Sequence, residues 1–469
     1  MRFALSCAVV LAVAGPALAE EPAPAMIGPA GEDADGYPLQ TADKRAVLRL
    51  LRAGRFDALD DWIADLQAQF EADYHKEYWP IDALEAFGNA DPTLAPLLDE
   101  WVDQRPDSWA ALAARGIYQE KLGWHRRGYK WADETPPANF RRMAEAHIDA
   151  VPDLEEALRR KPDLMAVHRA FIWIATANSL PLTFALVPFA DAVKRCPDCF
   201  VVRASMLYAM TPRWGGSYRK MRAFAKAAAQ SSANPKMKIL AGFADADRCD
   251  FEAKKKHLAS AFEACDAALA ASDYWGFHVE RSDVLRYAGR YIDALVELDR
   301  AAALRPQHLG ILERRLAVLQ RLRLYERVAA DTALLREIDP TEGIDKGDVP
   351  FAAQGLQYEA AQRRKAGHPG GEVTLLRRAV ALQPDDLDAH LRLDAALARA
   401  GKLAEVVVMW NHYLARHPDS GRAHAERGGA LHRLGREAEA QRDVRTACQL
   451  GETAVCGYVS RDARGSTTR

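Results

Sequence analysis

The sequence predicts an all-α protein whose C-terminal half is an α-solenoid of antiparallel helix pairs and whose N-terminal half is helical but irregular. The first reason is a spacing of 34 residues, which separates Pro306 from Pro340 and Pro384 from Pro418. The second is that each of these prolines lies between two apolar stretches with helical periodicity. A fixed period of this length is typical of stacked helix–turn–helix units. Because one unit cannot bury its apolar face alone, such units stack and leave a long concave surface.

The N-terminus has the pattern of a secretory signal. Arg2 supplies the positive charge, Phe3 to Ala14 form an apolar stretch, and Ala17-Leu18-Ala19 is a small-residue cleavage site. We therefore expect a signal peptide at 1–19, cleavage before Glu20, and a periplasmic or secreted mature protein.

Helical periodicity extends from Asp43 to near the C-terminus, and few runs alternate with a period of two. A chain of 469 residues is longer than one compact core usually holds, so we expect more than one structural part. The expected parts are a signal peptide at 1–19, a flexible leader at 20–42, a helical domain at 43–230, a connecting helix pair at 231–274, five repeats at 275–454 and a C-terminal tail at 455–469.

Residues 170–190 carry no charge and are numerous enough to span a bilayer. Asn178, Pro181 and Pro188 interrupt this stretch, and a proline inside a helix removes a hydrogen bond and clashes with the preceding turn. We expect two buried helices joined at Asn178–Pro181, with a membrane span as the alternative.

Six cysteines follow the signal, in three pairs that are close in sequence: Cys196 with Cys199, Cys249 with Cys265, and Cys448 with Cys456. An even, locally paired set suggests disulfides in an oxidising compartment. The short loop of the first pair makes it the least favourable of the three. The alternatives are buried free cysteines and, for the first pair, a metal knuckle or redox motif. No second Cys-x-x-Cys or suitably spaced histidine pair accompanies it, so we expect no metal.

The composition and motifs exclude several functions. The 63 Lys and Arg nearly balance the 65 Asp and Glu, which argues against a dedicated nucleic-acid binder. The sequence contains no Gly-x-Ser-x-Gly, His-Glu-x-x-His or phosphate-loop motif. We therefore expect neither an enzyme nor a bound cofactor.

The repeats resemble tetratricopeptide repeats (TPR). Aligned by period, they run 275–308, 309–342, 353–386, 387–420 and 421–454, with an insertion at 343–352. The family has a small residue at position 8, alanines at positions 20 and 27, and a proline at position 32. Residues that match are Ser282, Ala294, Ala301 and Pro306 in the first repeat, Ala360, Ala379 and Pro384 in the third, and Gly428, Ala440 and Ala447 in the fifth. Turns are expected near Gly289, Arg323, Gly367, Gly401 and Gly435.

The TPR resemblance implies a groove that binds a protein or peptide through helix A positions 2, 5, 9 and 12 of each repeat. Here these positions include Val279, Asp283, Arg286, Glu313, Gln320, Gln357, Arg364, Leu391, Ala395, Arg422 and His432. The Lys and Asn set that binds a C-terminal carboxylate in some members is absent.

The N-terminal half resembles a bacterial domain-of-unknown-function family that often accompanies TPRs. The resemblance rests on Gly123-Trp124 with Arg127-Gly128, and on Pro212-Arg213-Trp214-Gly215-Gly216-Ser217 with Met221 and Phe224. It extends over 55–230 and implies a helical exported or envelope-associated protein with no established activity.

The Pro212–Ser217 motif is the best candidate for chemistry. Ser217 is suited to cap a following helix, the glycines permit close backbone approach, and Arg213 could add a bidentate donor for a carboxylate or phosphate. The alternative is a tight turn with Trp214 packed in the core and Arg213 paired to a nearby acid.

A second basic-aromatic cluster contains Trp124 and Arg127. It could form a cation–π or anion-binding lip near the insertion, or be an amphipathic turn with solvated arginines.

Together these features predict an exported repeat protein that binds or scaffolds protein partners in the bacterial cell envelope. The alternative is an enzyme or small-ligand receptor with an anion site at the Arg213/Trp214 turn. A purely structural oligomerisation module is a third possibility.

Overall fold

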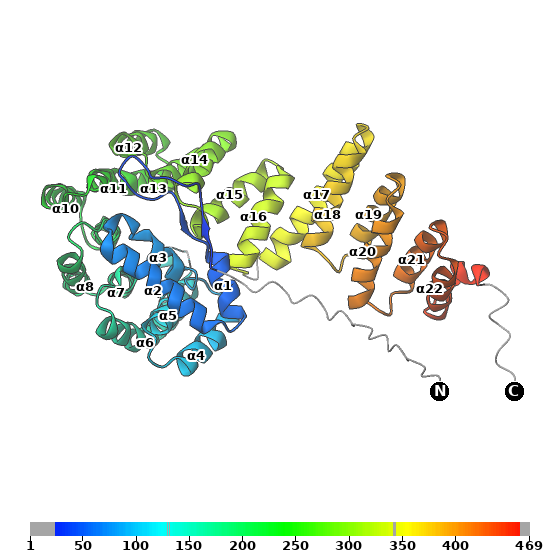
Figure 1. Cartoon of the computed structure of the whole chain (residues 1–469). Helices are drawn as coiled ribbons and strands as arrows, with labels where there is room; N and C mark the ends of the chain where they lie inside the picture. Colours follow the sequence, from blue (N-terminus) through cyan, green and yellow to red (C-terminus); the bar gives the residue numbers. More distant parts are fainter. Residues whose placement is uncertain (1–23, 129, 131, 341–343, 460–469) are drawn as a thin grey trace, which may run out of the picture. The chain divides into compact units, whose positions relative to one another are not determined.

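The computed structural model describes residues 24–459, apart from 129, 131 and 341–343. The signal expected at 1–19 lies outside these described residues. Within them the chain is almost entirely helical, as Figure 1 shows, and divides into two compact units. The first comprises the chain up to Gly88 with Pro92–Val202, and the second comprises Asn89–Asp91 with the chain from Arg203 onward. The all-α prediction is confirmed.

The first unit is a helical domain. Its helices are α1 (Lys44–Arg52), α2 (Phe56–Ala72), α3 (Tyr78–Glu85), α4 (Leu94–Gln104), α5 (Trp109–Arg127), α6 (Pro137–Arg160), α7 (Met165–Ala177) and α8 (Leu182–Arg195), and α9 (Val201–Ala209) begins at its end. Two glycines let α5 and α6 approach closely. A Cβ atom on Gly116 would lie 2.6 Å from the Leu154 side chain, and one on Gly123 would lie 2.5 Å from His147.

Residues 24–42, expected to belong to a flexible leader, are packed onto this unit. Strand β1 (Met26–Ile27) pairs antiparallel with β2 (Thr41–Ala42). Tyr37, in the loop between them, is 2% exposed, and its hydroxyl donates to Glu77 Oε1 at 2.8 Å. The buried Tyr37 explains why this segment is ordered and not a flexible leader. The many Gly, Pro and acidic residues around it gave no sign of this one buried contact.

Glu77 joins three distant parts of the first unit. Its side chain is fully buried, and besides Tyr37 it accepts the backbone N–H groups of Phe200 and Val201, each at 3.1 Å. These N–H groups are at the start of α9, where a helix has donors without intrahelical acceptors. A carboxylate at this end is favoured by the helix dipole as well.

The uncharged stretch 170–190 folds as α7 and α8, joined at the predicted turn, with Ser179 in the left-handed region at φ 53°. The prediction that both helices are buried is wrong for α8, since Phe184 is 56% and Val187 71% exposed. The uncharged sequence predicted the two helices, but it did not show which face of each helix is buried. None of the described helices has both the length and the apolar character needed to cross a membrane.

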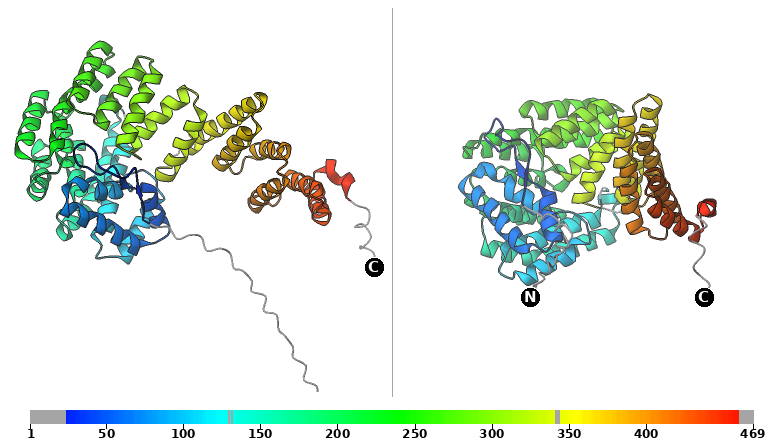
Figure 2. Two further views of the ribbon diagram at one scale, coloured as in Figure 1. Left: turned by 45° about the horizontal axis from the view of Figure 1, so that its top comes forward. Right: turned by 45° about the vertical axis from the view of Figure 1, so that its right-hand side comes forward.

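The second unit contains the five predicted helix pairs. Helix α10 (Tyr218–Ser231) precedes a pair in the connecting segment, α11 (Phe243–Lys254) with α12 (Leu258–Ala271). The five repeats are α13 (Trp275–Tyr287) with α14 (Tyr291–Leu304), α15 (Leu309–Arg321) with α16 (Tyr325–Ile338), α17 (Val349–Lys365) with α18 (Pro369–Leu382), α19 (Leu387–Arg399) with α20 (Leu403–Arg416), and α21 (Gly421–Arg433) with α22 (Glu437–Gln449). Figure 2 shows these pairs from two further sides.

Each pair turns through one residue in the left-handed conformation. The five predicted turn residues all have positive φ, from 55° at Arg323 to 76° at Gly367. Lys256 occupies the same place between α11 and α12, with φ 62°. Glycine adopts this conformation without a Cβ penalty, whereas other residues pay about 1–2 kcal/mol. The sixth turn identifies α11 and α12 as a further pair of the same kind, which lacks the glycine that marks most of the others.

An arginine at position 7 of helix A ties each of three repeats together. In the second repeat, Arg315 makes a two-point contact with Asp331 of helix B, at 2.8 and 2.7 Å, and lies 3.6 Å from Asp299 on helix B of the preceding repeat. In the first repeat, Arg281 contacts Glu297 of helix B and Asp266 of α12. In the fifth repeat, Arg427 contacts Asp443 of helix B and Asn411 of helix B in the fourth repeat. We call this arrangement the position-7 clamp.

We predict that Arg315→Leu destabilises the second unit by about 3 kcal/mol, because Asp331, whose side chain is 8% exposed, then lacks its counterion. The double variant Arg315→Leu/Asp331→Leu should recover much of this loss. Thermal unfolding followed by circular dichroism measures both. Equal destabilisation by the single and double variants would show that the pair contributes packing alone.

A short segment from the N-terminal half, Asn89–Asp91, belongs to the second unit. The Asn89 side chain donates to the Ile338 carbonyl at 2.9 Å, at the end of α16. The next residue, Asp339, is 8% exposed, and its Oδ1 has no hydrogen-bond partner among the described residues. Burial, reinforced by the carboxylates of Glu313 and Asp91, raises the pKa of Asp339 to about 6.

This pKa makes stability depend on pH. The folded state keeps Asp339 protonated up to about pH 6, whereas the unfolded chain releases the proton near its ordinary value of 3.8. The folded state is therefore favoured most below about pH 4, where Asp339 is protonated in both states, and this contribution to stability is lost as pH rises through about 6. We predict that Asp339→Asn stabilises the protein at pH 7.5 by about 3 kcal/mol relative to wild type and has little effect at pH 4. Unfolding midpoints across this range measure the difference, and a pH-independent difference would contradict the assignment.

Candidate functional site

The Pro212–Ser217 motif forms a tight turn before α10. Pro212–Trp214 is a short 3₁₀ turn, and Gly215 has φ 82°. A Cβ atom on Gly216 would lie 1.7 Å from the Met210 carbonyl oxygen, so this position requires glycine. Ser217 caps α10, as predicted, by accepting the Lys220 N–H at 3.3 Å.

The Arg213 side chain is held by two acids of α11. Its Nη2 donates to Asp247 at 2.6 Å and to Asp250 at 2.8 Å, and its guanidinium lies over the Tyr208 ring. Burial opposes the charge of Arg213, but these carboxylates raise its pKa above the ordinary value. Of the two interpretations of this motif, the structure therefore agrees with a tight turn whose arginine pairs with nearby acids. Trp214 is half-buried rather than in the core.

The Trp124 cluster lies in the first unit. Trp124 meets the rings of His147 and Trp173 edge-on, with centroids 6.5 and 6.3 Å away. Arg127 donates to the carbonyls of Gly128 and Lys130 at 3.0 and 3.1 Å. Arg127 therefore stabilises the turn after α5 rather than forming an open lip.

The candidate residues on helix A differ in how they are partnered. Arg286 donates to Asp283 at 2.6 Å and Gln320 to Asp348 at 2.6 Å. Arg422 lies 2.5 Å from Glu426, and His432 lies 2.7 Å from Glu437. Arg364 is exposed and makes no hydrogen bond or ion pair with any described residue.

Position 6 of helix A also contributes, which the sequence analysis missed. Arg314, at position 6 of the second repeat, donates to Asp283 of the first at 3.0 Å. Glu280 holds position 6 of the first repeat, and burial together with the carboxylates of Asp250 and Asp283 raises its pKa above its ordinary range. The sequence did contain a signal for this, because a charged residue recurs at position 6 in the first and second repeats. On α11, α13 and α15 several of the acids thus have counterions from this chain.

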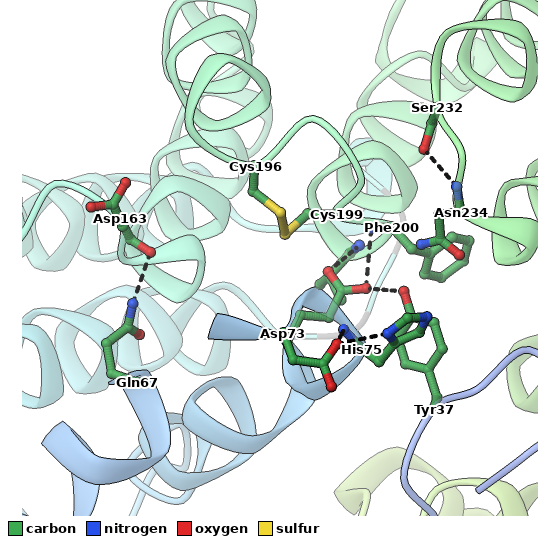
Figure 3. The surroundings of a disulfide bond; sticks show 12 residues. Tyr37, Gln67, Asp73, His75, Asp163, Cys196, Cys199, Phe200, Ser232 and Asn234 are labelled. Carbon is green, nitrogen blue, oxygen red and sulfur yellow. Dashed lines mark hydrogen bonds and ion pairs between the residues drawn. A yellow bond between two sulfur atoms is a disulfide. The ribbon is translucent and has the colours of Figure 1, made fainter. Parts of the chain in front are cut away.

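The structure brings each predicted cysteine pair to disulfide distance. Cα atoms are 5.4 Å apart for Cys196–Cys199, 5.2 Å for Cys249–Cys265 and 5.1 Å for Cys448–Cys456. The first pair closes the turn before Phe200, as Figure 3 shows. The second joins α11 to α12, and the third joins α22 to the turn Thr453–Tyr458. In the described ranges, no group of three or more His, Cys, Asp or Glu side chains is arranged to hold a metal ion.

We predict that non-reducing peptide mapping of the mature protein recovers the three cysteine pairs as linked peptides. Reduction of Cys249–Cys265, which closes a loop of about 16 residues, should destabilise the protein by about 3 kcal/mol. The variant Cys249→Ala/Cys265→Ala isolates this pair. Free thiols at all six positions would show that they are ordinary buried cysteines.

Residues 44–180 match the model of a family described as a domain of unknown function (DUF4034). The match includes Gly123-Trp124 and ends before Pro212. No curated protein sequence matches the chain.

Among solved structures, the chain is similar to the TPR domain of P58(IPK), with 14% identity, coverage of 87% of this chain and 99% of that one, and a TM-score of 0.24. It is also similar to YrrB, a TPR protein with an unusual peptide-binding site, with 15% identity, coverage of 41% and 92%, and a TM-score of 0.21. A third similar structure is a TPR protein from Parabacteroides merdae, with 15% identity, coverage of 55% of this chain and 96% of that one, and a TM-score of 0.23.

The described part of residues 275–454 forms an array of TPR-like helix pairs. The helix pairs, their left-handed turns and the buried small residue at position 8 of the first, third and fifth repeats carry this assignment. In the fifth TPR, a Cβ atom on Gly428 would lie 3.2 Å from Val444 and 3.3 Å from Asp443, so a larger residue would press on helix B.

Proposed function

We propose that this chain is an exported scaffold that binds protein partners of the cell envelope through the helix A face of its TPR array. The helix A face is defined by positions 2, 5, 6, 9, 12 and 13 of α13, α15, α17, α19 and α21. At 100° per residue these positions lie within one 120° arc of each helix. The observation that carries the proposal is the row of five helix pairs that repeats this arc.

The chemistry of the face supports a partner that is itself a chain. Small side chains at Ala317, Ala361 and Ala395 occupy position 9 in three consecutive repeats, so a backbone could approach there. Polar residues at positions 12 and 13 flank them, including Gln320, Arg364 and Lys365. A mixed surface of this kind suits an extended peptide better than a small molecule, for which a deep apolar pocket is typical.

We do not retain the anion-receptor alternative, because Asp247 and Asp250 pair with Arg213 and place two negative charges beside it. Export is supported by the pattern of residues 1–19 and by three cysteine pairs at disulfide distance. Disulfides of this kind persist in oxidising compartments.

A photo-crosslinking residue placed on each side of one repeat tests the binding face. We predict that p-benzoylphenylalanine at Ala395, on the helix A face, gives protein adducts in cells. The matched position is Val408 on helix B of the same repeat, which is 53% exposed. Adducts from Val408 alone, or from neither position, would contradict the proposal.

We predict that N-terminal sequencing of the protein isolated from a periplasmic extract begins at or near Glu20. The reason is the small-residue cleavage site at Ala17–Ala19. A substitution of Ala19 by a large residue should impair cleavage. A mature protein that retains Met1 and stays with the cytoplasmic fraction would contradict export.

A further inference from the structure

An aspartate of the first repeat is held between two arginines, and the equivalent site at the third repeat has the two arginines without the aspartate. In the first repeat, Asp283 receives two arginines: Arg286 donates to its Oδ1 at 2.6 Å and Arg314 to its Oδ2 at 3.0 Å. Each carboxylate oxygen therefore has its own guanidinium. The Asp283 side chain is 15% exposed, and both arginines are 37% exposed.

The corresponding site, formed by the third and fourth repeats, has both arginines but an alanine in place of the acid. A shift of 78 residues takes Arg286 to Arg364, Arg314 to Arg392, and Asp283 to Ala361. The helices obey the same shift: α14 (Tyr291–Leu304) becomes α18 (Pro369–Leu382), and α15 (Leu309–Arg321) becomes α19 (Leu387–Arg399). Because the helices and their connections have equal lengths, Arg364 and Arg392 flank Ala361 as Arg286 and Arg314 flank Asp283.

Arg364 and Arg392 are exposed, and neither guanidinium makes a hydrogen bond or ion pair with any described residue. Asp388 lies one turn before Arg392 on α19 but makes no ion pair with it. Lys365, next to Arg364, is also exposed and without an ion pair among the described residues. Glu359 of α17 pairs with Arg363, and Asp394 of α19 accepts the Trp410 indole N–H at 2.6 Å.

We propose that Arg364 and Arg392 bind an aspartate or glutamate side chain of an extended acidic segment in a partner protein, at the place that Asp283 fills in the first repeat. This inference rests on the proposed binding role of the helix A face and names the chemistry of its ligand. The planar carboxylate offers two oxygens to two guanidinium groups, which is the geometry that arginine favours. Ala361 leaves the space open, and the neighbouring Leu391 and Ala395 provide apolar contact for the residues beside the acid.

The probe is a fluorescent eight-residue peptide of alternating Glu and Ala, blocked at both ends, and its counterpart with Gln in place of Glu. Binding to the full mature protein is measured by fluorescence anisotropy at low ionic strength, because exposed charge pairs weaken as salt rises. We expect the Glu peptide to bind and the Gln peptide to bind at least about tenfold more weakly.

The decisive variant supplies the missing acid from the chain itself. Ala361→Asp should recreate the first repeat, occupy both arginines and weaken the Glu peptide by about tenfold, while leaving the helical circular dichroism unchanged. Ala361→Asn has nearly the same size without the charge and should bind as wild type does. Arg364→Gln and Arg392→Gln should each weaken binding several-fold. Arg219→Gln, an exposed arginine of α10, controls for the change in net charge.

Three results would overturn the inference. They are failure of wild type to bind the Glu peptide, equal binding by Ala361→Asp and wild type, or an equal loss in Ala361→Asn. A Gln peptide with a free C-terminus distinguishes the other carboxylate source, and its binding in preference to the Glu peptide would overturn the side-chain assignment. Crosslinks from Ala395 that persist in Ala361→Asp would leave the binding role intact and reject only the acidic ligand.

Discussion

In the first, second and fifth repeats, the position-7 clamp orients the stacked helices, because one arginine contacts helix B of its own repeat and helix B of the preceding helix pair. Arg315, for example, makes a two-point contact with Asp331 and approaches Asp299, so one side chain fixes the pairing within a repeat and the spacing between repeats. Apolar burial alone is not directional. The clamp adds a fixed orientation, which a surface assembled from successive helix A faces requires.

The helix pairs could be predicted from sequence because the 34-residue spacing and the turn glycines are local signals. The clamp could not be recognised one residue at a time, since Arg281, Arg315 and Arg427 look like surface arginines until their partners 16 residues later are aligned. The leader was misjudged for a similar reason. Tyr37 is one aromatic residue in a loop-like segment, and its partner Glu77 is 40 residues away. The exposed face of α8 was missed because an uncharged sequence does not show which side faces solvent.

In the candidate sites too, local features could be predicted from the sequence and distant partners could not. The glycines and Ser217 of the Arg213 turn were predicted correctly as a turn and a cap, because φ and capping preferences are local. The acids that hold Arg213 lie on another helix, 34 and 37 residues away, where no motif announces them. In the repeats, by contrast, internal duplication makes distant contacts readable. The first repeat shows what Arg286 and Arg314 do when an acid is present, and thereby what the third repeat lacks.

The buried Glu77 also bears on the order in which the first unit can fold. Its carboxylate receives Tyr37 from upstream and the Phe200 and Val201 amides from 123 and 124 residues downstream. Until residue 201 has been synthesised, the carboxylate lacks two of its donors, and burying it would leave a charge uncompensated. The first segment of the unit to be synthesised therefore reaches its final environment among the last. Long-range closure of this kind slows folding, so we expect the Glu77 site to form late in the folding of the first unit.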